Sequence, residues 1–115
     1  MASGKPPLIV SLSPAADDDL WEIWGDNLEE YKSVDHADSY LDFHRTGINR
    51  LATNYNDGKP IEGFEEFQFI TLRKNRRGHG HYVIFKVDEA QQLVKVLRVY
   101  HTRMDIQGRL RAQFR

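Results

Sequence analysis

Cysteine is absent from the sequence. Its absence excludes disulfide bonds, thiolate nucleophiles and zinc sites built on thiolates. Long apolar runs are also missing, because no stretch approaches the ~20 residues that a membrane helix needs. The apolar stretch at residues 8–12 is too short for the core of a signal peptide. We therefore expect a cytoplasmic protein that neither spans a membrane nor is secreted.

The sequence has little net charge, −1 for 115 residues, but the two halves of the chain carry net charges of opposite sign. Residues 1–67 contain 5 Lys or Arg against 14 Asp or Glu, and residues 68–115 contain 11 against 3. The basic second half favours an anionic partner, although mutual neutralisation within one fold explains the same numbers. With 40% hydrophobic residues and no long linker, the chain is expected to form one core.

The first half of the sequence predicts a strand followed by two helices. Residues 8–12 are apolar and β-branched, and Ser13-Pro14 then supplies a helix cap and a first-turn proline. Apolar residues at helical spacing predict one helix to about Tyr31 and a second over residues 37–55. The triplet at residues 17–19 is Asp-Asp-Asp, and we interpret it as charge favouring the helix dipole rather than as a metal site.

The second half changes from helical to alternating periodicity. Residues 67–74, 81–87 and 93–101 are rich in aromatic and β-branched residues, and short polar breaks separate them. The sequence thus predicts an α+β fold with the order βααβββ, an antiparallel sheet and an N-terminal helical hairpin on one face. We assign residues 7–106 to the domain and residues 107–115 to a basic tail that stays mobile until a partner binds.

Histidines raise the question of a metal site. His79 and His81 alternate on a predicted strand, and His101 lies on another, but no carboxylate accompanies them at a familiar spacing. We expect His79 and His81 to be solvated at a hairpin end and His44 to lie at the edge of the core. Neither a metal nor another cofactor is predicted.

Three strings carry a family resemblance. They are Ser13-Pro14-Ala15-Ala16 after the first strand, Trp21-Glu22-Ile23-Trp24 in the first helix, and the ending from Val96 to Asp105. In their order and spacing they resemble the ParE/RelE superfamily of toxins from type II toxin–antitoxin systems, with the ParE branch favoured. The resemblance implies a toxin that a cognate antitoxin neutralises in a hetero-oligomer, with DNA gyrase as the target and growth arrest as the outcome.

The alternative that the resemblance leaves open is a RelE-like endonuclease that cuts messenger RNA on the ribosome. Such an enzyme needs proton transfer and cations, for which Tyr100, His101, Arg98 and Arg103 are the candidates. Strand alternation places Arg98 with Tyr100 on one face and Val99 with His101 on the other, which Arg103 shares if the strand continues. The acidic first half favours a protein target over the ribosome, and hence a non-enzymatic inhibitor, without deciding between them.

Candidate contact residues follow from this interpretation. The target-facing surface is expected to comprise Arg98, His101, Arg103, Met104 and Asp105, with the hairpin residues Arg76 and Arg77. Trp21 and Phe43 lie off the inward faces of their helices, and exposed aromatic side chains often mark interfaces. We expect these two residues to contact the antitoxin, although packing by a loop or the tail explains them equally well.

Overall fold

The computed structural model describes residues 6–75 and 78–114. In chain order, the elements are β1 (Ile9–Leu12), α1 (Pro14–Tyr31), α2 (Val34–Asn49), α3 (Leu51–Asn54), the short 3-10 helix η1 (Tyr55–Asp57), β2 (Lys59–Ile61), β3 (Phe64–Leu72), β4 (His81–Asp88), β5 (Leu93–His101) and α4 (Ile106–Phe114). The predicted α+β class is confirmed.

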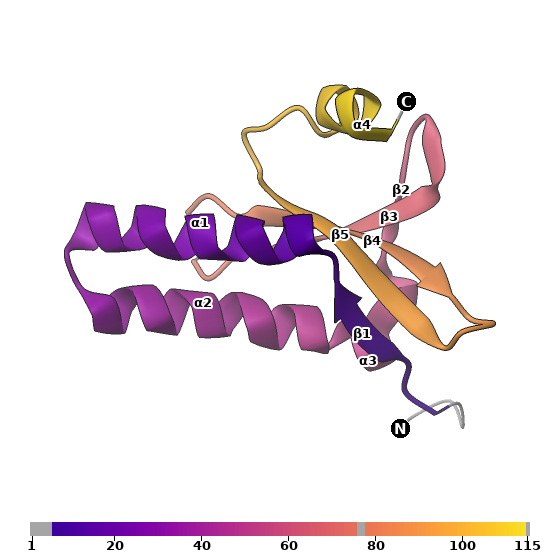
Figure 1. The fold of residues 1–115 in the computed structure, drawn as a ribbon, viewed down its shortest axis with the longest axis horizontal. Helices are drawn as coiled ribbons and strands as arrows, with labels where there is room; N and C mark the ends of the chain where they lie inside the picture. The colour runs from indigo at the N-terminus through magenta and orange to yellow at the C-terminus, as the bar shows by residue number, and fades with distance from the viewer. Residues whose placement is uncertain (1–5, 76–77, 115) are drawn as a thin grey trace.

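Two serine caps define the helical hairpin. The Ser13 hydroxyl accepts a hydrogen bond from the Ala16 amide at 3.0 Å and donates to the Leu97 carbonyl at 2.8 Å, so the start of α1 is tied to β5. At the other end, Lys32 adopts a left-handed conformation with φ 54°, which turns the chain sharply. Ser33 then caps α2 by accepting from the His36 amide. The hairpin predicted from the sequence is therefore present, with α1 and α2 side by side (Figure 1).

One five-stranded sheet, in the order β1-β5-β4-β3-β2, runs through the molecule. The strands β2 to β5 pair antiparallel, as expected, whereas β1 pairs parallel to β5. A bulge interrupts the β4–β5 pair, because Ile84 lies opposite Arg98 while Phe85 lies opposite Val96. Leu97 is the extra residue, and it shifts the alternation of every position that follows.

The two faces of the sheet support two separate hydrophobic clusters. The first cluster joins the α1–α2 hairpin to Val83, Phe85 and Val96. The second lies on the opposite face, where Ile84 and Tyr100 pack with Leu110 of α4. Helices therefore cover both faces, the hairpin on one and α4 on the other (Figure 1).

Several elements differ from the expectations. Residues 107–115 were assigned to a basic tail outside the domain, whereas residues 106–114 form α4, and its Leu110 is fully buried. The single helix expected over residues 37–55 divides into α2, α3 and η1. The strand β2 occupies a segment expected to be a loop, and it pairs only with the first part of β3.

Candidate functional site

The last residues of β5 point to two faces of the sheet. Val96 and Val99 both belong to the cluster beneath the helical hairpin, because the bulge at Leu97 lies between them. Arg98 and Tyr100 lie on the face that α4 covers, with the guanidinium carbon of Arg98 4.9 Å from the centre of the Tyr100 ring. The predicted pairing of Arg98 with Tyr100 is confirmed. The expected target-facing surface is thus divided between two faces.

Arg98 is engaged in a part-buried ion pair. Its Nε and Nη2 atoms both donate to the Asp19 carboxylate at 2.8 Å, and its Nη1 donates to Gln113 of α4 at 2.8 Å. Asp19 also accepts from the Val99 amide at 2.9 Å. The hydrogen bond and the charge of Asp19 raise the pKa of Arg98. All three nitrogen positions of Arg98 are therefore occupied within the chain.

Tyr100 is buried as well, with 2% of its surface exposed. Its hydroxyl donates to the same Gln113 side chain at 3.3 Å. Burial raises the pKa of Tyr100, which makes its hydroxyl a poorer source of a phenolate base. Two of the four residues expected to serve in RNA cleavage are consequently covered by α4.

A chain of histidines occupies the opposite face. His44 of α2 is fully buried, its Nδ1 lies 2.9 Å from the Tyr40 carbonyl, and its Nε2 lies 3.0 Å from Nδ1 of His81 on β4. A carbonyl only accepts, so Nδ1 of neutral His44 carries the proton and its Nε2 accepts from His81 Nδ1–H. Burial lowers the pKa of His44. Burial also lowers the pKa of His81 to about 3, and the nearby His44 and His101 add to this effect.

His101 continues this cluster toward the surface. It lies opposite His81 in the sheet, with ring centres 5.2 Å apart, and its Nδ1 accepts the Arg103 amide at 3.1 Å. The Arg103 guanidinium in turn bonds Nε2 of the exposed His79. Burial, followed by His79 and Arg103, lowers the pKa of His101. His101, Arg103 and His79 are thus linked by hydrogen bonds at the surface end of β5.

The remaining candidates lie in the connection to α4 or outside the described residues. Met104 is exposed, whereas Asp105 begins α4 by accepting from the Gly108 amide at 3.1 Å. Asp105 therefore has a structural role as a helix cap. Arg76 and Arg77 lie outside the described residues.

The two aromatic candidates lie on the helical hairpin. Trp21 is 50% exposed and packs edge to face with Trp24, and the Arg45 guanidinium lies 5.8 Å from its ring centre. Phe43 is partly buried and contacts Tyr40 and His44. It also lines a hollow of about 500 Å³ between α2 and the end of β3. Both side chains are thus accessible at the hairpin.

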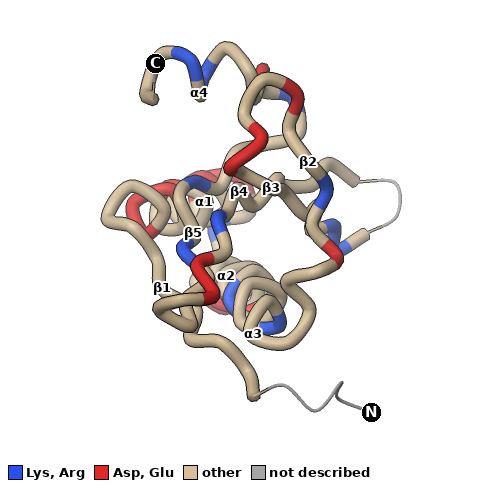
Figure 2. Tube along the Cα trace, turned by 90° about the vertical axis from the view of Figure 1, so that its right-hand side faces the viewer, with Lys and Arg blue, Asp and Glu red and all other residues tan. Residues whose placement is uncertain are grey.

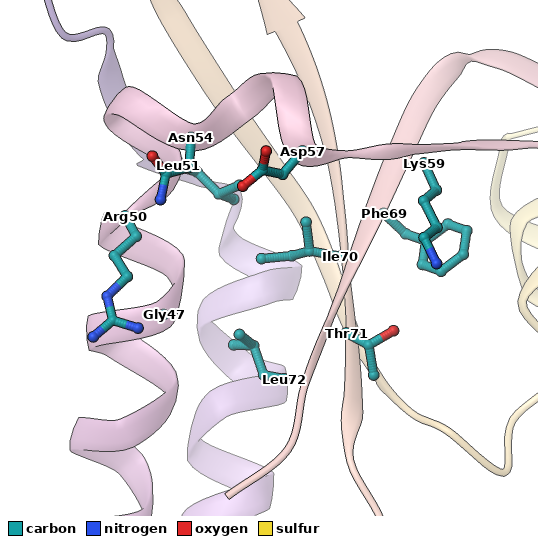
Figure 3. A pocket seen from close by; sticks show the side chains of 10 residues that line it. All are labelled: Gly47, Arg50, Leu51, Asn54, Asp57, Lys59, Phe69, Ile70, Thr71 and Leu72. Atoms are coloured by element: carbon teal, nitrogen blue, oxygen red, sulfur yellow. The ribbon is translucent and has the colours of Figure 1, made fainter. Parts of the chain in front are cut away.

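A second hollow, of about 370 Å³, adjoins this one. Ile70 and Leu72 project from β3 toward the helices and form its apolar wall (Figure 3). Gly47 permits the close approach of α2, because a Cβ atom there would lie 2.7 Å from the Leu72 side chain. Since β2 pairs with β3 only up to Phe69, the edge of β3 is open along this hollow. Together the two hollows form a groove along α2.

Charged positions of both signs are distributed over several elements. Acidic positions follow α1 and also occur at the β2–β3 hairpin, which α4 contacts through Gln107 and Glu62, while basic positions occur on β5 and α4 (Figure 2). The ion pair Asp19–Arg98 links the acidic half of the sequence to the basic half.

Four residues of this region were not identified from the sequence as site residues. Asp19 belongs to a triplet interpreted as favouring the helix dipole, yet it is the buried partner of Arg98. His81 was expected to be solvated but is 6% exposed, because α2 covers the start of β4. His44 lies inside the core rather than at its edge. Gln113 belongs to the segment expected to be a tail, and its contacts depend on α4.

Two absences concern only the part of the chain that the structure describes. There, no three His, Asp or Glu side chains meet as metal ligands. No helix in that part is long and apolar enough to cross a membrane.

Comparisons with known proteins agree with this architecture. Residues 10–106 match the family described as "ParE toxin of type II toxin-antitoxin system, parDE". "Toxin ParE1" from two strains of Mycobacterium tuberculosis, CDC 1551 and H37Rv, is 32% identical over 99 residues, covering 86% of this chain and 94% of the relative.

Two solved structures share the fold. A chain of the chromosomal ParDE system from P. aeruginosa superposes with a TM-score of 0.66 at 15% identity, covering 82% of this chain and 95% of that one. A chain of the RelBE2 toxin–antitoxin complex from M. tuberculosis gives a TM-score of 0.54 at 19% identity, covering 86% and 95%.

Proposed function

The chain belongs to the ParE family of toxins from type II toxin–antitoxin systems, and from that premise we propose that it inhibits DNA gyrase and thereby arrests growth in the cytoplasm. The observation that supports a non-enzymatic mechanism is the engagement of Arg98 and Tyr100. Both are held by Gln113 beneath α4, and Arg98 is paired with Asp19. The exposed residues Arg103 and Met104 then supply the contact with the target.

The alternative, ribosome-dependent cleavage of messenger RNA, has weaker support. A ribonuclease needs its cationic and proton-transferring groups free to reach phosphate and the 2′-hydroxyl. Arg98 and Tyr100 are not free in this sense, and His101 and Arg103 lie on the other face.

The gyrase proposal is tested with purified, folded protein in a DNA supercoiling assay. We expect inhibition by the natural sequence and about tenfold weaker inhibition by Arg103→Ala, which corresponds to the loss of one charge-assisted contact. Arg111→Ala removes another exposed arginine, on α4, and is the matched control that should retain full inhibition. If folded protein neither inhibits supercoiling nor promotes gyrase-linked DNA cleavage, gyrase is not the target. Messenger cleavage at ribosomal A sites would instead support the ribonuclease alternative.

We further propose that a cognate antitoxin forms a hetero-oligomer with this chain by contacting the helical hairpin. Trp21 is exposed on α1, and Phe43 lines the groove along α2. Cations Arg50, Arg73 and Lys74 border that groove and take part in no ion pair within the described segments, so they favour an acidic antitoxin segment. Binding by Trp21→Ala and Phe43→Ala, measured by calorimetry against Tyr82→Phe on the other face of the sheet, tests this interface. Unchanged affinity in both alanine variants would place the antitoxin elsewhere.

A further inference from the structure

The hydrogen bonds of His44 and His81 determine the protonation of one further nitrogen, Nε2 of His81. Because His81 donates from Nδ1 to His44, the Nε2 atom of neutral His81 carries a lone pair and no proton. This nitrogen has no hydrogen-bond partner among residues 6–75 and 78–114, and no fully buried side-chain nitrogen or oxygen of the same residues lacks one. His81 Nε2 therefore reaches solvent. It is an acceptor fixed by the Tyr40–His44–His81 chain.

This acceptor opens onto a pocket of about 390 Å³ between the far end of α1 and the β3–β4 connection. Asp26 and Glu30 of α1 line the same pocket, and neither forms an ion pair with any part of the chain that the structure describes. The exposed ring of Tyr31, stacked on His36 at 4.1 Å, also lines it. Two free carboxylates, a fixed acceptor and an aromatic ring thus converge on one space.

We propose that this pocket receives an arginine side chain of a protein partner. A guanidinium offers five N–H donors and no acceptor, which fits two carboxylates and a bare imidazole nitrogen. Its planar face also suits packing against Tyr31.

The charged groups at the pocket are already partly engaged. Among the described residues, Asp26 and Glu30 contribute carboxylates from α1, Lys74 contributes an ammonium that donates to Ser39 at 3.1 Å, and the Arg103 guanidinium bonds His79. The pocket histidines His79, His81 and His101 come from the opposite wall, and burial lowers the pKa of His81 to about 3. An ordinary histidine would gain a proton in mild acid and repel the guanidinium, whereas His81 stays neutral and keeps its acceptor.

The pocket itself is tested without any partner protein. Nitrogen-15 NMR of the full chain should show His81 as a neutral Nδ1–H tautomer. Addition of Nα-acetyl-arginine amide should then shift the His81 Nε2 resonance, while the uncharged isostere Nα-acetyl-citrulline amide should not. The double variant Asp26→Asn/Glu30→Gln should weaken arginine-amide binding about five- to tenfold, as expected for two partly exposed charge contacts. Glu29→Gln, on the same helix but outside the pocket, is the control. An Nε2–H tautomer for His81, or equal shifts with both amides, would overturn the proposal.

The source of the arginine rests on the proposed function, and two further measurements distinguish the target from the antitoxin. If the target supplies it, Asp26→Asn/Glu30→Gln loses toxicity on expression while antitoxin affinity is unchanged. If the antitoxin supplies it, toxicity persists and antitoxin affinity falls. Unchanged toxicity and unchanged antitoxin affinity would overturn the assignment to a protein partner. Failure of the natural sequence to arrest growth would contradict the proposed toxin function, and the amide titration would still decide whether the pocket binds arginine.

Discussion

Asp19 connects three elements through one carboxylate. It lies on α1, accepts from the side chain of Arg98 and the backbone of Val99 on β5, and reaches α4 because Arg98 also bonds Gln113. The strand β1 has ended at Leu12, opposite Val96, so the Val99 amide has no strand partner on that side. Asp19 satisfies the hydrogen bond that a longer β1 would have made.

Replacing Asp19 by alanine should destabilise the fold by about 3 kcal/mol, because a part-buried arginine and a buried amide both lose their acceptor. Urea denaturation measures this change. The exposed neighbour Asp18 is the control, since Asp18→Ala should alter the free energy of unfolding by less than about 0.5 kcal/mol. Equal effects of the two substitutions would show that Asp19 acts only through the helix dipole.

Because His44 and His81 are buried, we expect the free energy of unfolding to fall as the solution is acidified. The unfolded chain takes up a proton at His81 near its ordinary pKa of 6.5, whereas the folded chain resists protonation until about pH 3. The stability contributed by neutral His81 is therefore complete above pH 6.5 and is lost as the pH falls toward 3. One such group accounts for at most about 5 kcal/mol.

Urea midpoints measured from pH 7 to pH 4 check this prediction. The double variant His44→Leu/His81→Phe replaces both partners by apolar groups of similar size, and it should lose stability less steeply in acid than the natural sequence. His36→Gln removes an exposed histidine instead and should retain the natural slope. Parallel curves for all three proteins would refute the role of the buried pair.

At the scale of elements, α4 closes the second face of the sheet. Leu110 is fully buried against this face, and Phe114 contacts Phe67 with ring centres 5.1 Å apart. Leu110→Ala should therefore lower stability by about 2–4 kcal/mol through lost burial and a residual cavity. Arg111→Ala, on the exposed side of α4, should have almost no effect in the same thermal or urea unfolding experiment. A mobile tail would make both substitutions silent.

The sequence predicted the elements whose pattern is local. Helical spacing in α1 and α2 and β-branched runs in β3 to β5 are signals that the residues themselves contain. The helix α4 was missed because residues 107–115 are polar and rich in arginine, and among the described residues 107–114 only Leu110 is buried. The strand β2 contains Pro60, which predicts a loop, yet proline is accommodated at the edge of a sheet.

At the scale of the whole molecule, the site depends on contacts between distant residues. The pairs Asp19–Arg98 and His44–His81 join positions 79 and 37 residues apart in sequence, so local residue spacing does not predict them. Alternation did predict which residues of β5 share a face, but not that α4 and Asp19 would occupy Arg98. The charge difference between the two halves was visible in the sequence, and the Asp19–Arg98 ion pair that joins them was not.

The parallel pairing of β1 with β5 affects how the toxin is made. Residues 9–12 find their strand partner only at residues 93–96, so the sheet cannot close while the ribosome still holds residues 93–96. Domains fold during synthesis only after the segments that complete them have emerged. The nascent chain thus stays without its completed sheet, and without the surface that the end of β5 carries, until the residues of β5 have left the ribosome.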